Sequence, residues 1–332
     1  MSAIIILLFS LYFSKNVRLD ASSDTLILKD DKTFEFFEYY NKIFPSKNFL
    51  VLAVKSDVVI DKNYINTIND IKKNISNIEN VDSTFSIVDA PILLLNNLKI
   101  SDLASKEIKN INNSDEDLNL ILDELSGNQL FKNQIINSKK NLSSIIIYLK
   151  KNSDFYEIKE KRKLALTDKL NIKKINAEYI KAKKENNIIR KDLIEKIRKI
   201  IKNQGDSYEY FLGGIDMISS DTINFIKNDI IIFSIAVVAF IIIILFLIYR
   251  DIKWVLIPLF STFYSVIIMG GLIGIMNWEI TAISSNFISL MLILSISMNI
   301  HIINHYRINY FDIKINNKLS NTMKRMFWPC FY

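Results

Sequence analysis

The sequence predicts a membrane protein in which an α-helical transmembrane bundle carries a large α+β domain outside the cytoplasm. Apolar residues gather at the two ends of the chain, and Lys, Asn, Asp and Glu fill its middle from about Lys15 to Asp229. Charge-free runs near the C-terminus also reach membrane-spanning length. Half of the 332 residues are apolar and the formal net charge is +7. Because that composition suits a soluble protein as well, the membrane assignment rests on the distribution of the residues along the chain.

Twenty consecutive residues without a charge form the run Ile230–Tyr249. At about 1.5 Å per residue such a helix is about 30 Å long, which matches the hydrocarbon core of a bilayer. Two more charge-free runs follow, Trp254–Trp278 and Ile280–Tyr306. These runs predict three transmembrane helices, at residues 229–249, 254–277 and 281–305.

Charged residues separate the first two runs at Arg250, Asp251 and Lys253. A turn between two spans must keep its polar groups in water, so this stretch is typical of a membrane hairpin turn. Further basic residues follow the third run, whereas the loop between the second and third carries Glu279 alone. Basic loops favour the cytoplasm, so we expect residues 15–228 on the opposite, extracytoplasmic side.

Both ends of the chain predict incomplete helices. Residues 1–14 are apolar but too short to cross a membrane, and they lack the basic start and small-residue cleavage site of a signal peptide. We interpret them as part of a transmembrane helix whose beginning is missing. Residues 306–325 are expected to form a cytoplasmic loop, and the apolar residues 326–332 to begin a truncated fifth span.

The polar domain alternates helix and strand patterns. "KTFEFFEYYNKIF" has aromatic residues at helical spacing, and "NFLVLAVKS", "VDSTFSIVD", "LSSIIIYLK" and "SYEYFLGG" have strand patterns. "KNYINTINDIKKNISNI" and "IIRKDLIEKIRKIIKNQG" predict the helices between them. Two β-α-β passes favour a ferredoxin-like α+β fold with helices on one face of the sheet. We expect helical insertions at about 92–141 and 152–186.

Motifs for catalysis and for metal binding are missing from the sequence. It has no Cys/His metal spacing, no Walker-type loop and no Gly-x-Ser-x-Gly. We therefore expect no enzymatic activity, no metal and no cofactor. The single cysteine, Cys330, excludes an intrachain disulfide. Glu residues interrupt the Lys-rich tract from about Lys139 to Lys202, which favours a solvated helix face over a nucleic-acid surface.

Two sets of residues inside the spans are candidates for function or packing. Small residues let helices approach closely, so we assign Gly270, Gly271 and Gly274 to helix packing. Polar groups at membrane depth line substrate or ion paths, although serine hydroxyls also bond to the carbonyl four residues earlier; both interpretations stay open. At 100° per residue, one line holds Asn286, Ser289, Ser297, His301 and Asn304, and a second holds Ser284, Ser295 and Asn299. Six of these residues are our candidates for a polar relay through the membrane: Asn286, Ser289, Ser297, Asn299, His301 and Asn304.

The region from residue 213 to residue 329 resembles the first half of a resistance-nodulation-division (RND) exporter of the mycobacterial membrane protein large (MMPL) kind. The resemblance rests on "GGIDMISSDTINFIKNDIII", "YRDIKWVLIP", "GGLIGIMNWEITAISSNFISLMLILSISMNIHIINHYR" and "NTMKRMFWP", and on the order of one span, a large domain and then consecutive spans. It implies a porter-type domain and a twelve-span protein in a bacterial inner membrane. It also implies proton-driven export of lipids or other hydrophobic molecules.

Partners follow from the same resemblance: membrane lipids, a hydrophobic substrate, further copies of the chain, and periplasmic or outer-membrane proteins. One departure concerns the last span, where many relatives carry an acidic residue followed by Tyr and this chain has Ser297 and Met298. Proton coupling then runs through the missing half, uses His301, or is absent. The alternatives to an exporter are a non-transporting membrane sensor and a protein-translocation accessory of the same superfamily.

Overall fold

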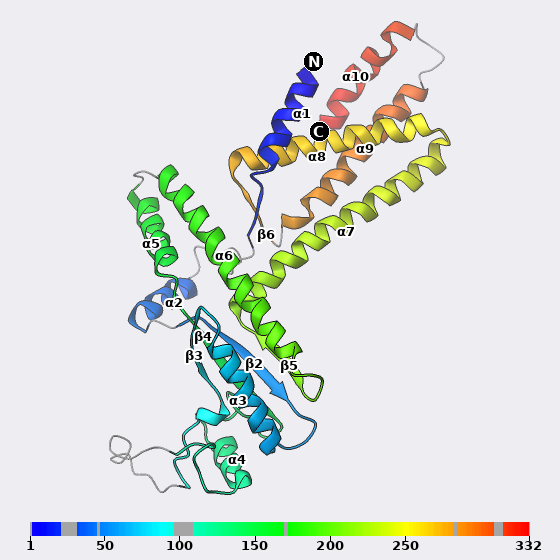
Figure 1. Cartoon of the computed structure of the whole chain (residues 1–332). Helices are drawn as coiled ribbons and strands as arrows, with labels where there is room; N and C mark the ends of the chain where they lie inside the picture. Colours follow the sequence, from blue (N-terminus) through cyan, green and yellow to red (C-terminus); the bar gives the residue numbers. More distant parts are fainter. Residues whose placement is uncertain are drawn as a thin grey trace. The chain divides into compact units, whose positions relative to one another are not determined.

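The structure of the chain is a computed structural model that divides into two compact units (Figure 1). One unit joins Met1–Leu26 to Asp221–Tyr332, and the other is Ile27–Ser220. We call them the membrane unit and the polar domain. The described residues are 2–20, 32–44, 47–95, 109–168, 172–281, 284–308 and 315–331.

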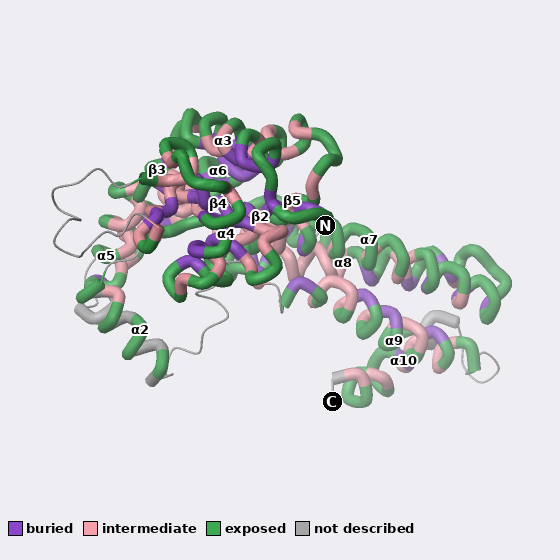
Figure 2. The backbone as a smooth tube through the Cα atoms, turned by 90° about the horizontal axis from the view of Figure 1, so that it is seen from below, coloured by how far each residue is buried: buried purple, intermediate pink, exposed green. Residues whose placement is uncertain are grey.

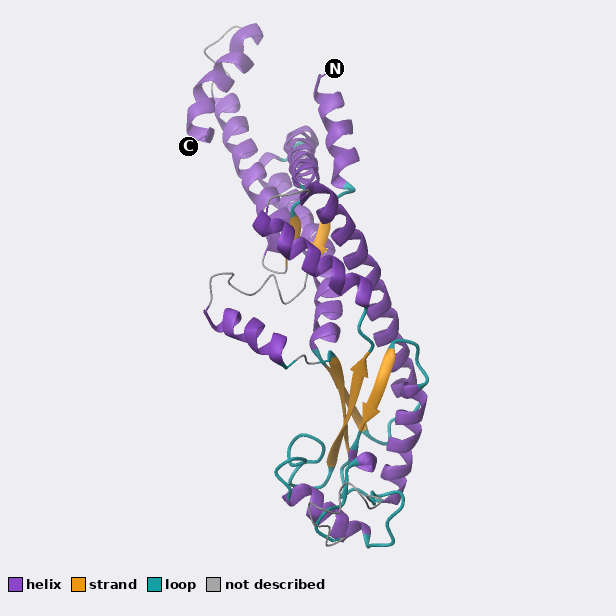
Figure 3. Cartoon of the chain, turned by 90° about the vertical axis from the view of Figure 1, so that its left-hand side faces the viewer, coloured by secondary structure: helices purple, strands orange, loops and turns teal. Residues whose placement is uncertain are grey.

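A four-stranded antiparallel sheet forms the centre of the polar domain (Figure 3). The strand order is β3-β4-β2-β5, and each neighbouring pair is antiparallel. Each β-α-β pass therefore joins two parallel strands with a strand of the other pass between them, which is the ferredoxin-like arrangement. The strands are β2 (Phe49–Lys55), β3 (Val81–Phe85), β4 (Leu142–Leu149) and β5 (Glu209–Gly213).

Helices α3 (Lys62–Ser76) and α6 (Ile172–Lys202) make the two crossovers. Asp61 caps α3 because its side chain accepts a hydrogen bond from the Tyr64 backbone N–H at 2.8 Å. Apolar residues recur along α3 at helical spacing and are all buried, so this face of the helix packs on the sheet. The expected strands and the expected helices between them are thus confirmed in the described residues.

The core of the polar domain lies between the sheet and these two helices (Figure 2). Alternate residues of β2 point inward, and both Leu50 and Leu52 are fully buried. Leu193 and Ile197 of α6 pack into the same core. Each fully buried aliphatic side chain of this kind stabilises the fold by about 1.5–3 kcal/mol.

The stretches expected as insertions differ from one another in structure. In the described part of 92–141, one helix, α4 (Leu118–Gly127), is followed by turns, and Ile121, Phe131 and Ile136 join the domain core. In the described part of 152–186, α5 (Ser153–Asp168) and the first half of α6 pack against each other. A further helix, α2 (Lys32–Ile43), precedes the sheet.

The membrane unit is helical apart from one short pair of strands. Three of its helical segments are long and apolar enough to cross a membrane, as the charge-free runs predict: Ile215–Tyr249, Ile252–Met276 and Ser284–Ile308. Its elements are α1 (Ser2–Ser14), β1 (Arg18–Asp20), α7 (Ile215–Tyr249), α8 (Ile252–Met276), β6 (Glu279–Thr281), the 3-10 helix Ser284–Asn286, α9 (Phe287–Ile308) and α10 (Ile315–Phe331).

Several boundaries differ from the expected ones. Helix α7 starts at Ile215 rather than at 229, because a helix outside lipid tolerates charged residues. Thr281 lies in β6 rather than at the start of a span, and α9 begins at Phe287. The expected loop 306–325 contains the first part of α10, where apolar residues recur at helical spacing.

A buried hydroxyl, that of Tyr64, ties α3 to two strands. It donates to the Val54 carbonyl at 2.6 Å, lies 2.8 Å from the Ser143 hydroxyl, and accepts from the Ser143 N–H at 3.0 Å. Burial raises the pKa of Tyr64 to about 12. Between pH 10 and about 12 the unfolded chain therefore releases this proton while the folded chain keeps it. Stability is thus full below pH 10 and falls as the pH rises to about 12.

Replacing Tyr64→Phe leaves the Val54 carbonyl and the Ser143 groups without this partner. We expect the free energy of unfolding at neutral pH to fall by about 1–3 kcal/mol. The free energy of unfolding of the variant also falls less than that of the parent protein as the pH rises above 10. Denaturant unfolding of the detergent-solubilised protein measures both effects. Tyr39→Phe is the control, because Tyr39 is 63% exposed. Equal stability of the two variants would contradict the stabilising role of the Tyr64 hydroxyl.

Candidate functional site

Helices α1 and α8 pack in parallel with one constant register. The Tyr264 hydroxyl donates to the Ala3 carbonyl at 3.3 Å, and these residues are 261 positions apart. Gly271 faces Ser10 and Gly274 faces Phe13, and the two residues of each pair are again 261 positions apart in the sequence. The parallel strands β1 and β6 continue it, since Arg18 pairs with Glu279. Two distant segments of the chain thus lie side by side from helix to strand.

The glycines of "GGLIG" make this close approach possible. A Cβ added at Gly271 lies 2.5 Å from the Ser10 Cα, and one added at Gly274 lies 2.0 Å from the Phe13 carbonyl oxygen. Both distances are far below van der Waals contact. At Gly270 the nearest atom is the Ser14 Cβ at 3.7 Å, an ordinary contact. The structure therefore places two of the three assigned glycines directly against the α1 backbone.

The strand pair at the end of α1 and α8 is stabilised by a side-chain bond. The Arg18 Nη2 donates to the Asn277 Oδ1 at 3.1 Å. Asn277 ends α8 in the left-handed conformation with φ of 53°, which Asn adopts more readily than most residues. Sequence patterns did not predict β1 and β6, because three residues are too few to show alternation. In the sequence, the end of α8 is signalled by Asn277, which follows the apolar run.

Two of the six polar candidates in the last span bond to neighbouring helices. The Asn299 Nδ2 donates to the Thr262 Oγ1 at 3.3 Å and lies 3.5 Å from the Pro258 carbonyl oxygen. Thr262 is 1% exposed, so this contact is at the centre of the α8–α9 packing. The Asn304 Oδ1 accepts from the Tyr249 hydroxyl at 3.1 Å and thereby links α9 to the end of α7.

The other four candidates lie apart from this packing. Ser297 and His301 are exposed on α9, Ser289 is half-buried, and Asn286 is exposed in the 3-10 helix before α9. No hydrogen bond joins two of the six described side chains. The structure therefore places them in α9 and in the 3-10 helix before it without connecting them into a chain of hydrogen bonds, and the relay stays a prediction.

Aromatic and basic side chains gather where α7 ends, α8 begins and α9 ends. The Arg307 guanidinium lies over the rings of Tyr249 and Trp254, at 5.2 Å and 5.9 Å from their centroids. Trp254 also contacts the Tyr306 ring, with 6.0 Å between centroids. Such cation–π contacts stabilise by about 0.5–1 kcal/mol each. The two basic segments that we expect in the cytoplasm therefore lie on one side of the spans.

The polar domain presents a second candidate surface on the side of the sheet opposite α3 and α6. Paired residues point to the same face, and Val51 pairs with Ile146 while Phe49 pairs with Tyr148. Phe49 and Phe211 are 49% and 54% exposed, and the other three are half-buried. We call Phe49, Val51, Ile146, Tyr148 and Phe211 the open sheet face.

Metal chemistry has no visible place in the described residues. Within the ranges that the structure describes, no group of three His, Cys, Asp or Glu side chains is arranged to hold a metal ion. The candidates in the membrane unit are helix packing and isolated polar groups of the last span, and the polar domain by itself has an apolar sheet surface.

The fold and these sites define a membrane protein with three candidate spans and a mixed helix and sheet domain. The model of the MMPL family matches residues 180–301, which include most of α6, β5, α7, α8 and most of α9. This match confirms the resemblance found in the sequence and supports a membrane transporter of the RND superfamily. A comparison with curated proteins finds no match.

Alanine substitutions at the glycines test the packing of α1 on α8. Gly271→Ala and Gly274→Ala force the α1 backbone to move, so we expect each to lower stability by about 1–3 kcal/mol. Gly270→Ala is the matched control, because its added methyl meets only the Ser14 Cβ at 3.7 Å. Thermal unfolding in detergent measures the difference.

A labelling experiment reports on the same contact directly. In a Cys330→Ser background, Ser10→Cys is a probe whose position is 5% exposed. We expect slow maleimide labelling of this probe, and faster labelling when Gly274→Ala is added. Equal labelling rates with Gly270→Ala and Gly274→Ala would contradict the register.

Proposed function

We propose that the chain is part of a secondary active exporter of the RND superfamily, which moves lipids or other hydrophobic molecules at the expense of the proton gradient. The observation that carries this proposal is the MMPL match across residues 180–301. It covers two candidate spans, most of the third and most of α6 in the last crossover of the polar domain, which are parts that a transporter must couple.

The proposal places the chain in the inner membrane of a bacterium with the polar domain outside the cytoplasm. Arg307 lies against Tyr249 and Trp254, so the turn between α7 and α8 and the end of α9 share one side of the spans. Basic residues at span ends favour the cytoplasmic side. The polar domain, which joins the opposite end of α7, is then extracytoplasmic.

In this proposal the open sheet face receives the substrate. Its two phenylalanines are about half exposed, and the Phe49 and Tyr148 rings lie 6.4 Å apart. Aromatic rings bury much apolar area per side chain. An acyl chain or another apolar group gains free energy by covering them, at about 25 cal/mol per Å². A polar molecule gains nothing comparable there.

Proton movement in this proposal uses His301, with Ser297 one turn earlier on the same exposed strip of α9. No Asp or Glu lies in Ile230–Tyr249, Trp254–Trp278 or Ile280–Tyr306. A proton path through these spans then depends on a histidine and on hydroxyl groups, since imidazole and hydroxyl groups can each donate and accept a hydrogen bond.

Transport by the intact protein in proteoliposomes tests the function. We expect export of a fluorescent amphiphile that needs an imposed proton gradient and stops when a protonophore is added. His301→Ala and Ser297→Leu lower the proton-dependent rate, whereas Leu294→Ala, at an exposed apolar position of the same helix, leaves it unchanged. Proton-dependent transport at the full rate in both variants would remove these two residues from the mechanism.

Substitutions on the open sheet face test the site of substrate binding. Phe49→Ser with Phe211→Ser removes two exposed rings, so we expect the apparent substrate affinity to fall about tenfold for each 1.4 kcal/mol lost. Val58→Ser is the control, because Val58 is exposed in the same domain but lies outside the sheet. Equal KM values for the control and the double variant would exclude this face as the binding surface.

A further inference from the structure

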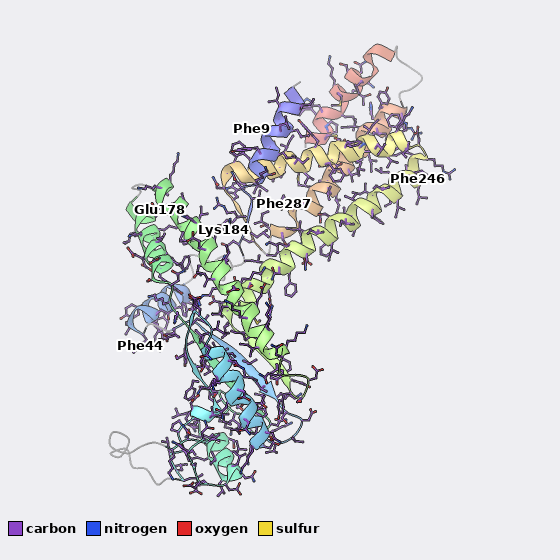
Figure 4. All side chains as sticks on the ribbon, in the orientation of Figure 1. Phe9, Phe44, Glu178, Lys184, Phe246 and Phe287 are labelled. Carbon is purple, nitrogen blue, oxygen red and sulfur yellow. The ribbon has the colours of Figure 1, made fainter. Side chains whose placement is uncertain are left out.

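Helix α2 carries an aromatic face that is exposed in the structure. The large apolar side chains that the structure describes here are each at least half exposed, from 50% for Ile43 to 66% for Phe36. Figure 4 marks Phe44, the last of them, directly after the helix. Large contiguous apolar patches on a protein surface generally mark contact with another protein, a ligand or a membrane. The aromatic face of α2 consists of Phe36, Phe37, Tyr39, Tyr40, Ile43 and Phe44.

The sequence places this face on one side of the helix. At 100° per residue the six positions fall within an arc of about 160°. The positions of Glu35, Glu38 and Lys42 fall within an arc of about 60° on the opposite side. The position of Lys32, at the start of the helix, falls inside the apolar arc, and that of Phe34 falls between the two arcs. From Glu35 onward the helix is therefore amphipathic, and the ring contact between Tyr40 and Phe44, with centroids 5.1 Å apart, runs along its apolar side.

We propose that the aromatic face of α2 lies in the interface between water and the membrane, with its rings among the lipid headgroups and upper acyl chains. Five of the six side chains are aromatic, and two are tyrosines, whose rings are apolar while their hydroxyls are polar. Aromatic side chains of this kind concentrate at membrane interfaces. The polar side carries two acids and one base, so insertion of the rings drives binding without attraction to anionic lipid.

The length of the chain limits how far α2 can lie from the end of β1. Strand β1 ends at Asp20, where it pairs with Thr281 at the end of β6. That pair follows α8, which is a candidate span with the exposed Trp278 just beyond its end. Residues 21–31 separate Asp20 from α2, and a chain of that length spans at most about 40 Å. The helix is thus tethered to the end of the spans that joins the polar domain.

Depth-dependent quenching in the full chain tests this inference without measuring transport. The protein carries Cys330→Ser and one new cysteine, and it is labelled with an environment-sensitive dye in vesicles of phosphatidylcholine alone. We expect a dye at Tyr40→Cys to be quenched more by lipids with a spin label near the headgroup than by lipids labelled at the chain end. A dye at Glu38→Cys, on the opposite side of α2, stays in water and is quenched by iodide.

Leu120→Cys is a matched control, because Leu120 is 49% exposed on α4 of the same domain. Lipid quenching equal to that of this control overturns the proposal. Protection of Tyr40→Cys from both lipid and iodide also overturns it, since protein then covers the face. If protein covers the face, dilution of the protein in the vesicles shows which protein it is. Protection by a second copy is lost on dilution, whereas protection by another part of the same chain is not. Because no step needs a proton gradient, the outcome is independent of the proposed export.

Discussion

The membrane unit depends on one steric constraint, the close approach of α1 to α8 at Gly271 and Gly274. Within lipid the hydrophobic effect does not drive one apolar helix onto another, so association relies on close packing and on small residues. Here the α1 backbone lies so near that a single methyl group at either glycine has no space. The register set by this contact continues into β1 and β6. The chain therefore leaves the membrane unit after β1 already fixed to the end of α8.

Elements with a long or strongly periodic pattern could be predicted from the sequence. The spans follow from charge-free runs, because a charged group in hydrocarbon is costly over the whole length of the helix. The strand β2 and the helix α3 follow from alternation and from apolar residues at helical spacing. The strands β1 and β6 could not be found, because their pairing depends on the neighbouring helices rather than on their own three residues. Helix α7 extends before the predicted span at 229–249, because charged residues mark the end of an apolar run and not the end of a helix.

The candidate site was predictable in kind but not in arrangement. Periodicity puts Ser297 and Asn299 on different lines of one helix, but it does not say which line a neighbouring helix covers. The structure shows that Asn299 bonds to α8 while Ser297 stays exposed. The open sheet face could not be predicted, because its strand pattern suggests burial. "NFLVLAVKS" is apolar at successive positions, which favours burial on both sides, and Phe49 is nevertheless half exposed.

Helix α7 has a mechanical consequence. Its 35 residues contain neither Pro nor Gly, the residues at which helices most often kink. At about 1.5 Å per residue it is about 52 Å long, well beyond the thickness of the hydrocarbon core. Its first residues belong to the polar domain and the rest to the membrane unit, with no break in the helix between them. The polar domain and the membrane unit are therefore joined at this point by continuous helical backbone, with hydrogen-bonded turns where a loop would otherwise link two domains.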